Sequence, residues 1–353
     1  VLESFNPDQN AIEATRVKAE SLLKKHPKQI PLLVRATLLA MHVKDLSAAR
    51  KYIKAILSQD PENAQGLALR GTLRWRAGKL EGARKDFDAV VAQKPRHPVA
   101  NNFFAYMAIS EGNFQCGKAD DENCEDAITL ARKALVGNPR DLNAYALLAY
   151  SYHRIGDEDM ARLVTISARE ISDTFSDIYN LLGIIDYEAN QPALAGKSFE
   201  KAHELTPNHV EVRLNLAALA MSVSDFDTSL EQLNAAGTLR PQSVEILISK
   251  GVSYRGLQDY EKAEQSYLKA LELSPENAEV RYNLCVLKQE HQQDFEAALK
   301  WCSEYKEKIT RKHVKWKEIK NRVSGLKATI EILRESQEAS ESPAGEDSPA
   351  PAE

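Results

Sequence analysis

Four cysteines and one short acidic run are the residues most able to do chemistry. Cys116 and Cys124 flank the acids in CGKADDENCED, while Cys285 and Cys302 lie much further along the chain. A zinc site needs four ligands, yet no C-x-x-C pair exists and the eight histidines are scattered. The acidic run lacks the central Gly and the terminal Glu of a calcium loop. We therefore predict no metal and no cofactor.

Catalytic signatures are also missing from the sequence. There is no Gly-rich phosphate loop, no G-x-S-x-G and no H-E-x-x-H. Without a nucleophile, base and orienting group at a recognisable spacing, we predict no catalytic residues and a protein that is not an enzyme.

The cysteines fall into two local pairs. Cys116 and Cys124 close a nine-residue loop, which a disulfide would stabilise by about 2 to 3 kcal/mol in the entropic account. Cys285 and Cys302 lie on two neighbouring predicted helices and form the second candidate pair. Oxidised pairs would indicate the periplasm or another oxidising compartment rather than the cytoplasm. The alternative is that the loop cysteines coincide by chance and that Cys285 is only a small packing residue.

A repeat of 34 residues defines the elements that position these side chains. Prolines mark the same point of successive units, with a ten-residue insertion in the third unit and Asp173 in place of one proline: Pro27, Pro61, Pro95, Pro139, Pro207, Pro241 and Pro275. Such a period predicts a repeat architecture.

Other residue types recur in the same register. Counting the proline as position 32, position 20 is small in every unit: Ala49, Ala83, Ala127, Ala161, Ala195, Ser229, Ala263 and Ala297. Position 8 is small in most units: Gly71, Ala105, Ala149, Gly183, Ala217, Gly251 and Cys285. Position 24 is often aromatic: Phe87, Phe199, Tyr267 and Trp301. Arg70 and Lys250 depart from the pattern, because each occupies a normally apolar position.

This pattern resembles the tetratricopeptide repeat, W-x2-L-G-x2-Y followed by A-x3-F, A and P. The unit at 178–207 matches it best, with Tyr179, Gly183, Ala195, Phe199 and Pro207 in register. The resemblance covers residues 30–311. It implies an all-α protein, a right-handed α-solenoid (superhelix) of helix hairpins with a long C-terminal capping helix.

The predicted organisation has four parts. They are an orphan N-terminal helix or partial repeat at 1–29, eight repeat units, a basic amphipathic helix at 305–339 and a disordered tail at 340–353. The units are 30–63, 64–97, 98–141, 142–175, 176–209, 210–243, 244–277 and 278–311. In the first part, Ala19 and Leu22 are expected to be buried. Because the chain begins with Val1 and only the second helix of a unit, we expect it to continue a longer array or a divergent cap.

The helix at 305–339 carries one apolar seam, with apolar residues three and four apart: Trp316, Ile319, Val323, Leu326, Ile330 and Leu333. We interpret it as a cap over the last repeat, with self-association through this seam as the alternative.

The composition of the chain restricts the classes of partner that it could bind. The chain is 43% hydrophobic with a net charge of −5 and no broad basic face, which argues against nucleic acid. No apolar run approaches the length of a membrane span, so we predict no transmembrane segment.

The resemblance implies that a protein partner binds along the concave surface of the first helices, as an extended or helical segment. The residues at the corresponding positions are apolar, aromatic and amide side chains: Asn102, Tyr106, Asn143, Tyr150, His153, Asn180, Ile184, Tyr187, Leu214, Met221 and Tyr282. We predict a non-enzymatic scaffold of a multiprotein complex, with a bacterial envelope, pilus or motility complex as one setting. The alternative is the interaction module of a larger enzyme whose catalytic domain lies upstream of Val1.

Overall fold

A computed structural model describes residues 9–114 and 126–341. Within these ranges the chain forms helices and no strand, which confirms the predicted all-α solenoid of helix hairpins. It divides into two compact units, Val1–Pro207 and Asn208–Glu353. Predictions for Cys116, Cys124 and residues 342–353 of the tail concern residues outside the described ranges, whereas residues 340 and 341, predicted as tail, are helical.

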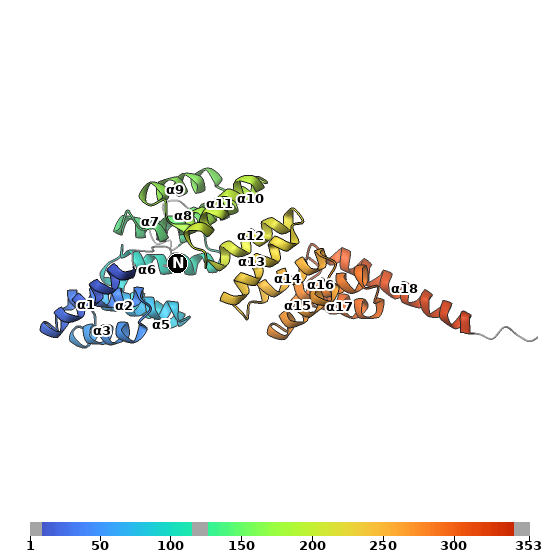
Figure 1. Ribbon diagram of the computed structural model, residues 1–353, viewed down its shortest axis with the longest axis horizontal. Coiled ribbons are helices and arrows are strands. Elements are labelled where there is room, and N and C mark those ends of the chain that lie inside the picture. The colour runs from blue at the N-terminus through green and yellow to red at the C-terminus, as the bar shows by residue number, and fades with distance from the viewer. Residues whose placement is uncertain (1–8, 115–125, 342–353) are drawn as a thin grey trace, which may run out of the picture. The chain divides into compact units, whose positions relative to one another are not determined.

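The first unit holds one single helix followed by five hairpins (Figure 1). Its helices are α1 (Gln9–Lys25), α2 (Ile30–His42), α3 (Leu46–Gln59), α4 (Ala64–Arg76), α5 (Leu80–Gln93), α6 (Pro98–Ser110), α7 (Ala127–Gly137), α8 (Leu142–Arg154), α9 (Glu158–Ile171), α10 (Ser176–Glu188) and α11 (Pro192–Leu205).

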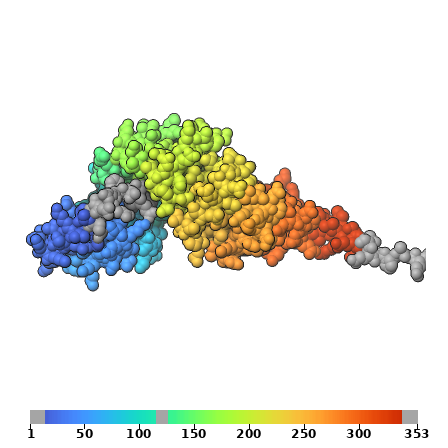
Figure 2. Space-filling view, viewed as in Figure 1, coloured from blue at the N-terminus to red at the C-terminus, as the bar shows by residue number. Residues whose placement is uncertain are grey.

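The second unit holds three hairpins and a final long helix. Its helices are α12 (Val210–Ser222), α13 (Phe226–Leu239), α14 (Val244–Gly256), α15 (Tyr260–Leu273), α16 (Ala278–Val286), which continues into the π-helical turn η1 (Leu287–His291), then α17 (Phe295–Lys308) and α18 (Trp316–Glu341). Figure 2 shows the described part of this unit, coloured yellow to red, as a continuous packed surface on the face in view.

In each hairpin, one described residue after the first helix has the left-handed conformation. These residues follow the first helix of every hairpin: Lys44, Gly78, Gly112, Gly156, Asn190, Ser224, Gln258 and Gln293. In several hairpins an Asp comes next and caps the second helix, as where the Ala48 amide donates to Asp45 Oδ1 at 3.0 Å. The left-handed residue stops the first helix and the carboxylate starts the second, so the reversal is encoded locally.

Glycine at position 8 lets the two helices of a hairpin approach closely. A Cβ added at Gly183 would lie 2.4 Å from Phe199 Cε1, and one at Gly251 would lie 2.3 Å from Tyr267 Cε1. Gly71 meets the ring of Phe87 in the same way. In these three hairpins the glycine at position 8 therefore makes room for the aromatic ring at position 24.

The eighth hairpin differs from the predicted register by one residue. The left-handed residue recurs 34 residues after Ser224, at Gln258, but 35 residues later at Gln293. The turn η1 absorbs the extra residue, since a π-helical turn spends one more residue than an α-helical one. Position 20 is therefore Ala298, which is fully buried, and not Ala297, which is only half-buried. Position 24 is likewise not Trp301.

This shift brings Cys302 to position 24, opposite Cys285 at position 8. A disulfide joins the two, with 5.0 Å between their Cα atoms, and both are fully buried. It takes the place of the ring packed on glycine that three other hairpins have at these two positions.

Reducing this bond should lower the free energy of unfolding of the second unit by about 3 kcal/mol, because it closes a loop with a sequence separation of 17. Urea unfolding with and without reductant measures the difference. A variant with Cys116 and Cys124 both replaced by Ser leaves only the pair in question to respond. Two free thiols in that variant before reduction would contradict the assignment.

The predicted helix at 305–339 is broken, and this part of the prediction was wrong. Helix α17 ends at Lys308 and α18 begins at Trp316. The break lets α18 fold back onto α17, where Ile319, Val323 and Leu326 enter a core cluster with Tyr305. Because a continuous helix would carry this seam away from the last repeat, burial of the seam favours the break.

At the other end, α1 packs against α2. Ala19 is buried as expected, but Leu22 is 41% exposed and Leu23 is buried in its place. Leu23 joins the core cluster of α2 and α3, so the choice between two adjacent leucines is decided by the neighbouring helix.

Candidate functional site

The first helices of three consecutive hairpins line one cleft in the first unit. We call it the α4–α8 cleft; its volume is about 250 Å³. Helices α4, α6 and α8 supply its lining: Thr72, Trp75, Arg76, Val99, Asn102, Tyr106, Asp141, Asn143 and Leu147. Three of the residues predicted for a groove, Asn102, Tyr106 and Asn143, lie together here.

Hydrogen-bond acceptors gather at the end of the cleft near α8. The Asp141 carboxylate caps α8 by accepting from the amides of Asn143 at 3.1 Å and Ala144 at 3.3 Å. Asn102 Nδ2 donates to Asp141 Oδ2 at 3.0 Å, so the amide oxygen of Asn102 points elsewhere. Asn102 Oδ1 and Asn143 Oδ1 are buried and accept no hydrogen bond from the described residues.

Burial raises the pKa of Asp141 above its usual value, and its hydrogen bonds only partly offset this. The two amide oxygens of Asn102 and Asn143 are costly to leave without donors, at about 1 to 3 kcal/mol each. The cleft is therefore suited to a ligand that brings N–H groups.

Aromatic rings form the other wall. Trp75 on α4 lies with its ring centroid 5.4 Å from that of Tyr106, which is 40% exposed. Trp75 also meets the fully buried Phe103 edge-on at 5.4 Å, and Phe103 packs on Phe87 at 4.8 Å. The exposed ring of Tyr106 thus rests on Trp75, and Trp75 packs on the hydrophobic core.

The other predicted residues of the first unit lie further along, on α8 and α10. The Tyr150 hydroxyl accepts from Arg154 Nη1 at 3.0 Å. His153 is buried, with one ring nitrogen 2.9 Å from Glu158 and the other 3.3 Å from Glu188. On α10, Asn180 and Ile184 are half-buried and Tyr187 is 39% exposed. His153 therefore bridges hairpins, whereas Tyr187 presents a free aromatic surface.

In the second unit the predicted residues are all half-buried. Leu214 and Met221 are half-buried on α12. The Tyr282 hydroxyl donates to Glu318 Oε1 at 2.9 Å, and Lys315 Nζ lies 3.6 Å from its ring centroid. The first turn of α18 and the residue before it thus contact Tyr282.

Sequence reasoning missed the α4 side of the cleft and Asp141. Thr72, Trp75 and Arg76 occupy positions 9, 12 and 13 of their unit, the same positions that selected the predicted residues of later units. Extending the register by one unit would have found them. Asp141 precedes its helix as a cap, so only its neighbours in space reveal its place in the cleft.

Two negative findings concern the described ranges alone. Within them, no three His, Cys, Asp or Glu side chains cluster so that they could hold a metal ion. Nor is any helix there long and apolar enough to cross a membrane.

Comparisons with known proteins agree with this geometry. The family description Tetratricopeptide repeat matches residues 38–98 and 244–277. The human Protein O-mannosyl-transferase TMTC3 is 26% identical over 182 residues, which are 51% of this chain and 18% of that protein. The Peroxisomal targeting signal receptor of Candida albicans is 32% identical over 92 residues, 25% of this chain and 16% of that one. The chain thus spans less than a fifth of either relative.

Among solved structures, the APC/C hetero-tetramer Cut9-Hcn1 superposes with a TM-score of 0.67 and 16% identity, covering 90% of this chain and 60% of that one. At such identity the likeness shows the fold alone. The repeat register, the hairpins and the family matches together show that this chain is a tetratricopeptide repeat protein.

Proposed function

We propose that the chain is a non-catalytic scaffold that binds an extended segment of a partner protein in the α4–α8 cleft. The unsatisfied oxygens of Asn102 and Asn143, beside the adjoining rings of Trp75 and Tyr106, carry this proposal. Backbone amides of an extended peptide supply donors whatever its sequence, and Trp75 and Tyr106 offer large contact area at low entropic cost. The exposed ring of Tyr187 on α10 is a candidate for extending the contact.

The test starts from peptides selected against this protein from a displayed library. For the tightest selected peptide, the double variant Trp75→Ala, Tyr106→Ala should weaken binding at least about 30-fold, because buried aromatic anchors contribute about 1 to 2 kcal/mol each or more. Fluorescence anisotropy of the labelled peptide measures the affinity.

A matched control removes two exposed apolar side chains from outside the cleft. Leu163 and Ile166 on α9 are 54% and 51% exposed, and Leu163→Ala, Ile166→Ala should leave the affinity within about twofold. Equal losses in both variants, with helicity unchanged, would place the binding site elsewhere.

The alternative is an interaction module of a larger enzyme. The match to human Protein O-mannosyl-transferase TMTC3 supports this candidate, since the module would then present protein substrates to a transferase. An immunoblot of the native cell with an antibody to this chain distinguishes the two. A product near 39.4 kDa, the mass of the chain, contradicts the module, and a much larger product supports it.

The disulfide bears on the compartment in which the scaffold acts. The Cys285–Cys302 disulfide supports an oxidising compartment, of which the periplasm is one. A place in an envelope, pilus or motility complex stays a prediction from the sequence. Self-association through α18 is a weaker candidate, because Ile319, Val323, Leu326 and Ile330 are already buried within the chain.

A further inference from the structure

A second concave site, the basic pocket, lies in the first unit between α3 and α4. Its volume is about 540 Å³, and its lining combines cations with apolar side chains: Arg50, Ile53, Lys54, Leu57, Ser58, Arg70, Leu73, Arg74, Ala77 and Lys79. None of these residues lines the α4–α8 cleft, because they lie on the other face of α4 from Thr72, Trp75 and Arg76.

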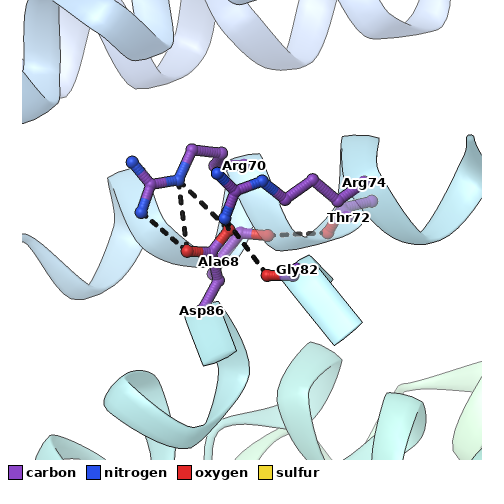
Figure 3. A network of polar contacts seen from close by, with 6 residues as sticks. All are labelled: Ala68, Arg70, Thr72, Arg74, Gly82 and Asp86. Atoms are coloured by element: carbon purple, nitrogen blue, oxygen red, sulfur yellow. Dashed lines mark hydrogen bonds and ion pairs between the residues drawn. The ribbon is translucent and has the colours of Figure 1, made fainter. Parts of the chain in front are cut away.

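One buried carboxylate organises two of the cations. Asp86 on α5 is only 3% exposed and accepts from Arg70 Nη2 and from Arg74 Nη1, each at 2.7 Å (Figure 3). Arg74 Nη1 also donates to the Gly82 carbonyl at 3.1 Å. The departure of Arg70 from the repeat pattern is thereby explained, since its partner Asp86 holds it in place.

The remaining cations have no acidic partner. Arg50, Lys54 and Lys79 are exposed, and within the described ranges no carboxylate lies at ion-pair distance from them. Five cations against the single carboxylate of Asp86 leave a formal excess of four positive charges around one pocket. Because the whole chain has a net charge of −5, this excess of positive charge is a local property of the pocket.

The floor of the pocket is apolar. Ile53 is 4% exposed, and Leu57 and Leu73 are half-buried. A ligand that complements both the cations and the apolar floor carries several negative charges and a flat or short apolar group. The fixed guanidinium groups of Arg70 and Arg74 suit phosphate oxygens, which accept from planar N–H groups. The pocket volume also lies within the range of small-ligand sites, about 300 to 1,000 Å³.

We propose that the basic pocket binds a small organic polyphosphate of the nucleoside phosphate class. The phosphates lie among Arg50, Lys54 and Lys79 against the anchored pair Arg70 and Arg74, and the base lies on Leu57 and Leu73. This site is independent of the α4–α8 cleft and of the function proposed for it.

Calorimetric titration at physiological salt tests the site with three probes: ATP without magnesium, inorganic tripolyphosphate and a hexaglutamate peptide. We expect one site per chain, with ATP tighter than tripolyphosphate because only ATP covers the apolar floor. The triple variant Arg50→Ala, Lys54→Ala, Lys79→Ala should lose at least about 10-fold in ATP affinity.

The matched control is Lys51→Ala, Arg84→Ala, Lys85→Ala, which removes the same charge from exposed positions of the same unit that do not line the pocket. It should retain ATP affinity within about threefold. Equal losses in both triple variants would overturn the proposal, as would tighter binding of hexaglutamate than of ATP, or no ATP binding at all. Peptide binding in the α4–α8 cleft, measured on the same triple variants, should not change.

Discussion

Replacing Leu326 by Asp should release α18 from the last hairpin. Leu326 is 2% exposed and packs in one cluster with Cys285, Cys302, Tyr305 and Ile319. Loss of the side chain alone costs about 2 to 5 kcal/mol, and a carboxylate buried in its place adds several more. Because the helix can escape by detaching, we expect a local opening that exposes the apolar face of α17.

Hydrogen exchange resolves this opening from global unfolding. The expected result is loss of protection over α18 and α17, with protection over α12 to α15 retained. Ala328→Asp is the matched control, because it changes the charge equally at an exposed position of the same helix. Sedimentation of both variants also tests self-association. Identical protection in the two variants would refute the role of α18 as a cap.

The second large effect is expected at Phe87. Its ring is fully buried, seated on Gly71 and packed against Phe103 with 4.8 Å between centroids. Phe87→Ala should cost about 3 to 5 kcal/mol of the free energy of unfolding of the first unit, because it leaves a cavity where backbone and ring were in contact. Urea unfolding measures the loss.

The same variant connects the core with the α4–α8 cleft. Phe103 supports Trp75, so the peptide affinity of folded Phe87→Ala should fall, whereas Phe87→Leu keeps most of the volume and should cost about 1 to 2 kcal/mol. If Phe87→Ala unfolds at the same urea concentration as the unchanged protein, the packing of this ring on Gly71 does not stabilise the first unit, which would contradict the prediction.

The fold could be predicted because its determinants are local and repeated. Proline, small and aromatic residues return in register, and each hairpin carries its own turn and cap, as at Lys44 and Asp45. The exceptions arise where one residue changes the geometry. The extra residue absorbed by η1 moves Cys302 onto Cys285, and the break after Lys308 turns α18 back. Neither leaves a signal in the 34-residue period.

The sites were harder to predict than the fold. The repeat register indicated that Asn102, Tyr106 and Asn143 are groove residues. It did not indicate that the carboxylate of Asp141 would be buried beside them. His153 and Tyr282 occupy groove positions of the register, yet contacts with Glu158, Glu188 and Glu318 engage them within the protein. The basic pocket was not foreseen, because its cations come from separate helices and assemble only in the folded hairpins.

The most direct test of peptide binding uses Trp75 as its own reporter. The chain has three tryptophans, so Trp301→Phe, Trp316→Phe leaves Trp75 alone in the α4–α8 cleft. Titration with the selected peptide should shift the emission of Trp75 to shorter wavelength, because the peptide covers the half-exposed indole. The shift should follow a saturation curve with the same dissociation constant as that measured by anisotropy. Binding at full affinity with unchanged emission would show that the peptide lies elsewhere and would contradict the proposed function.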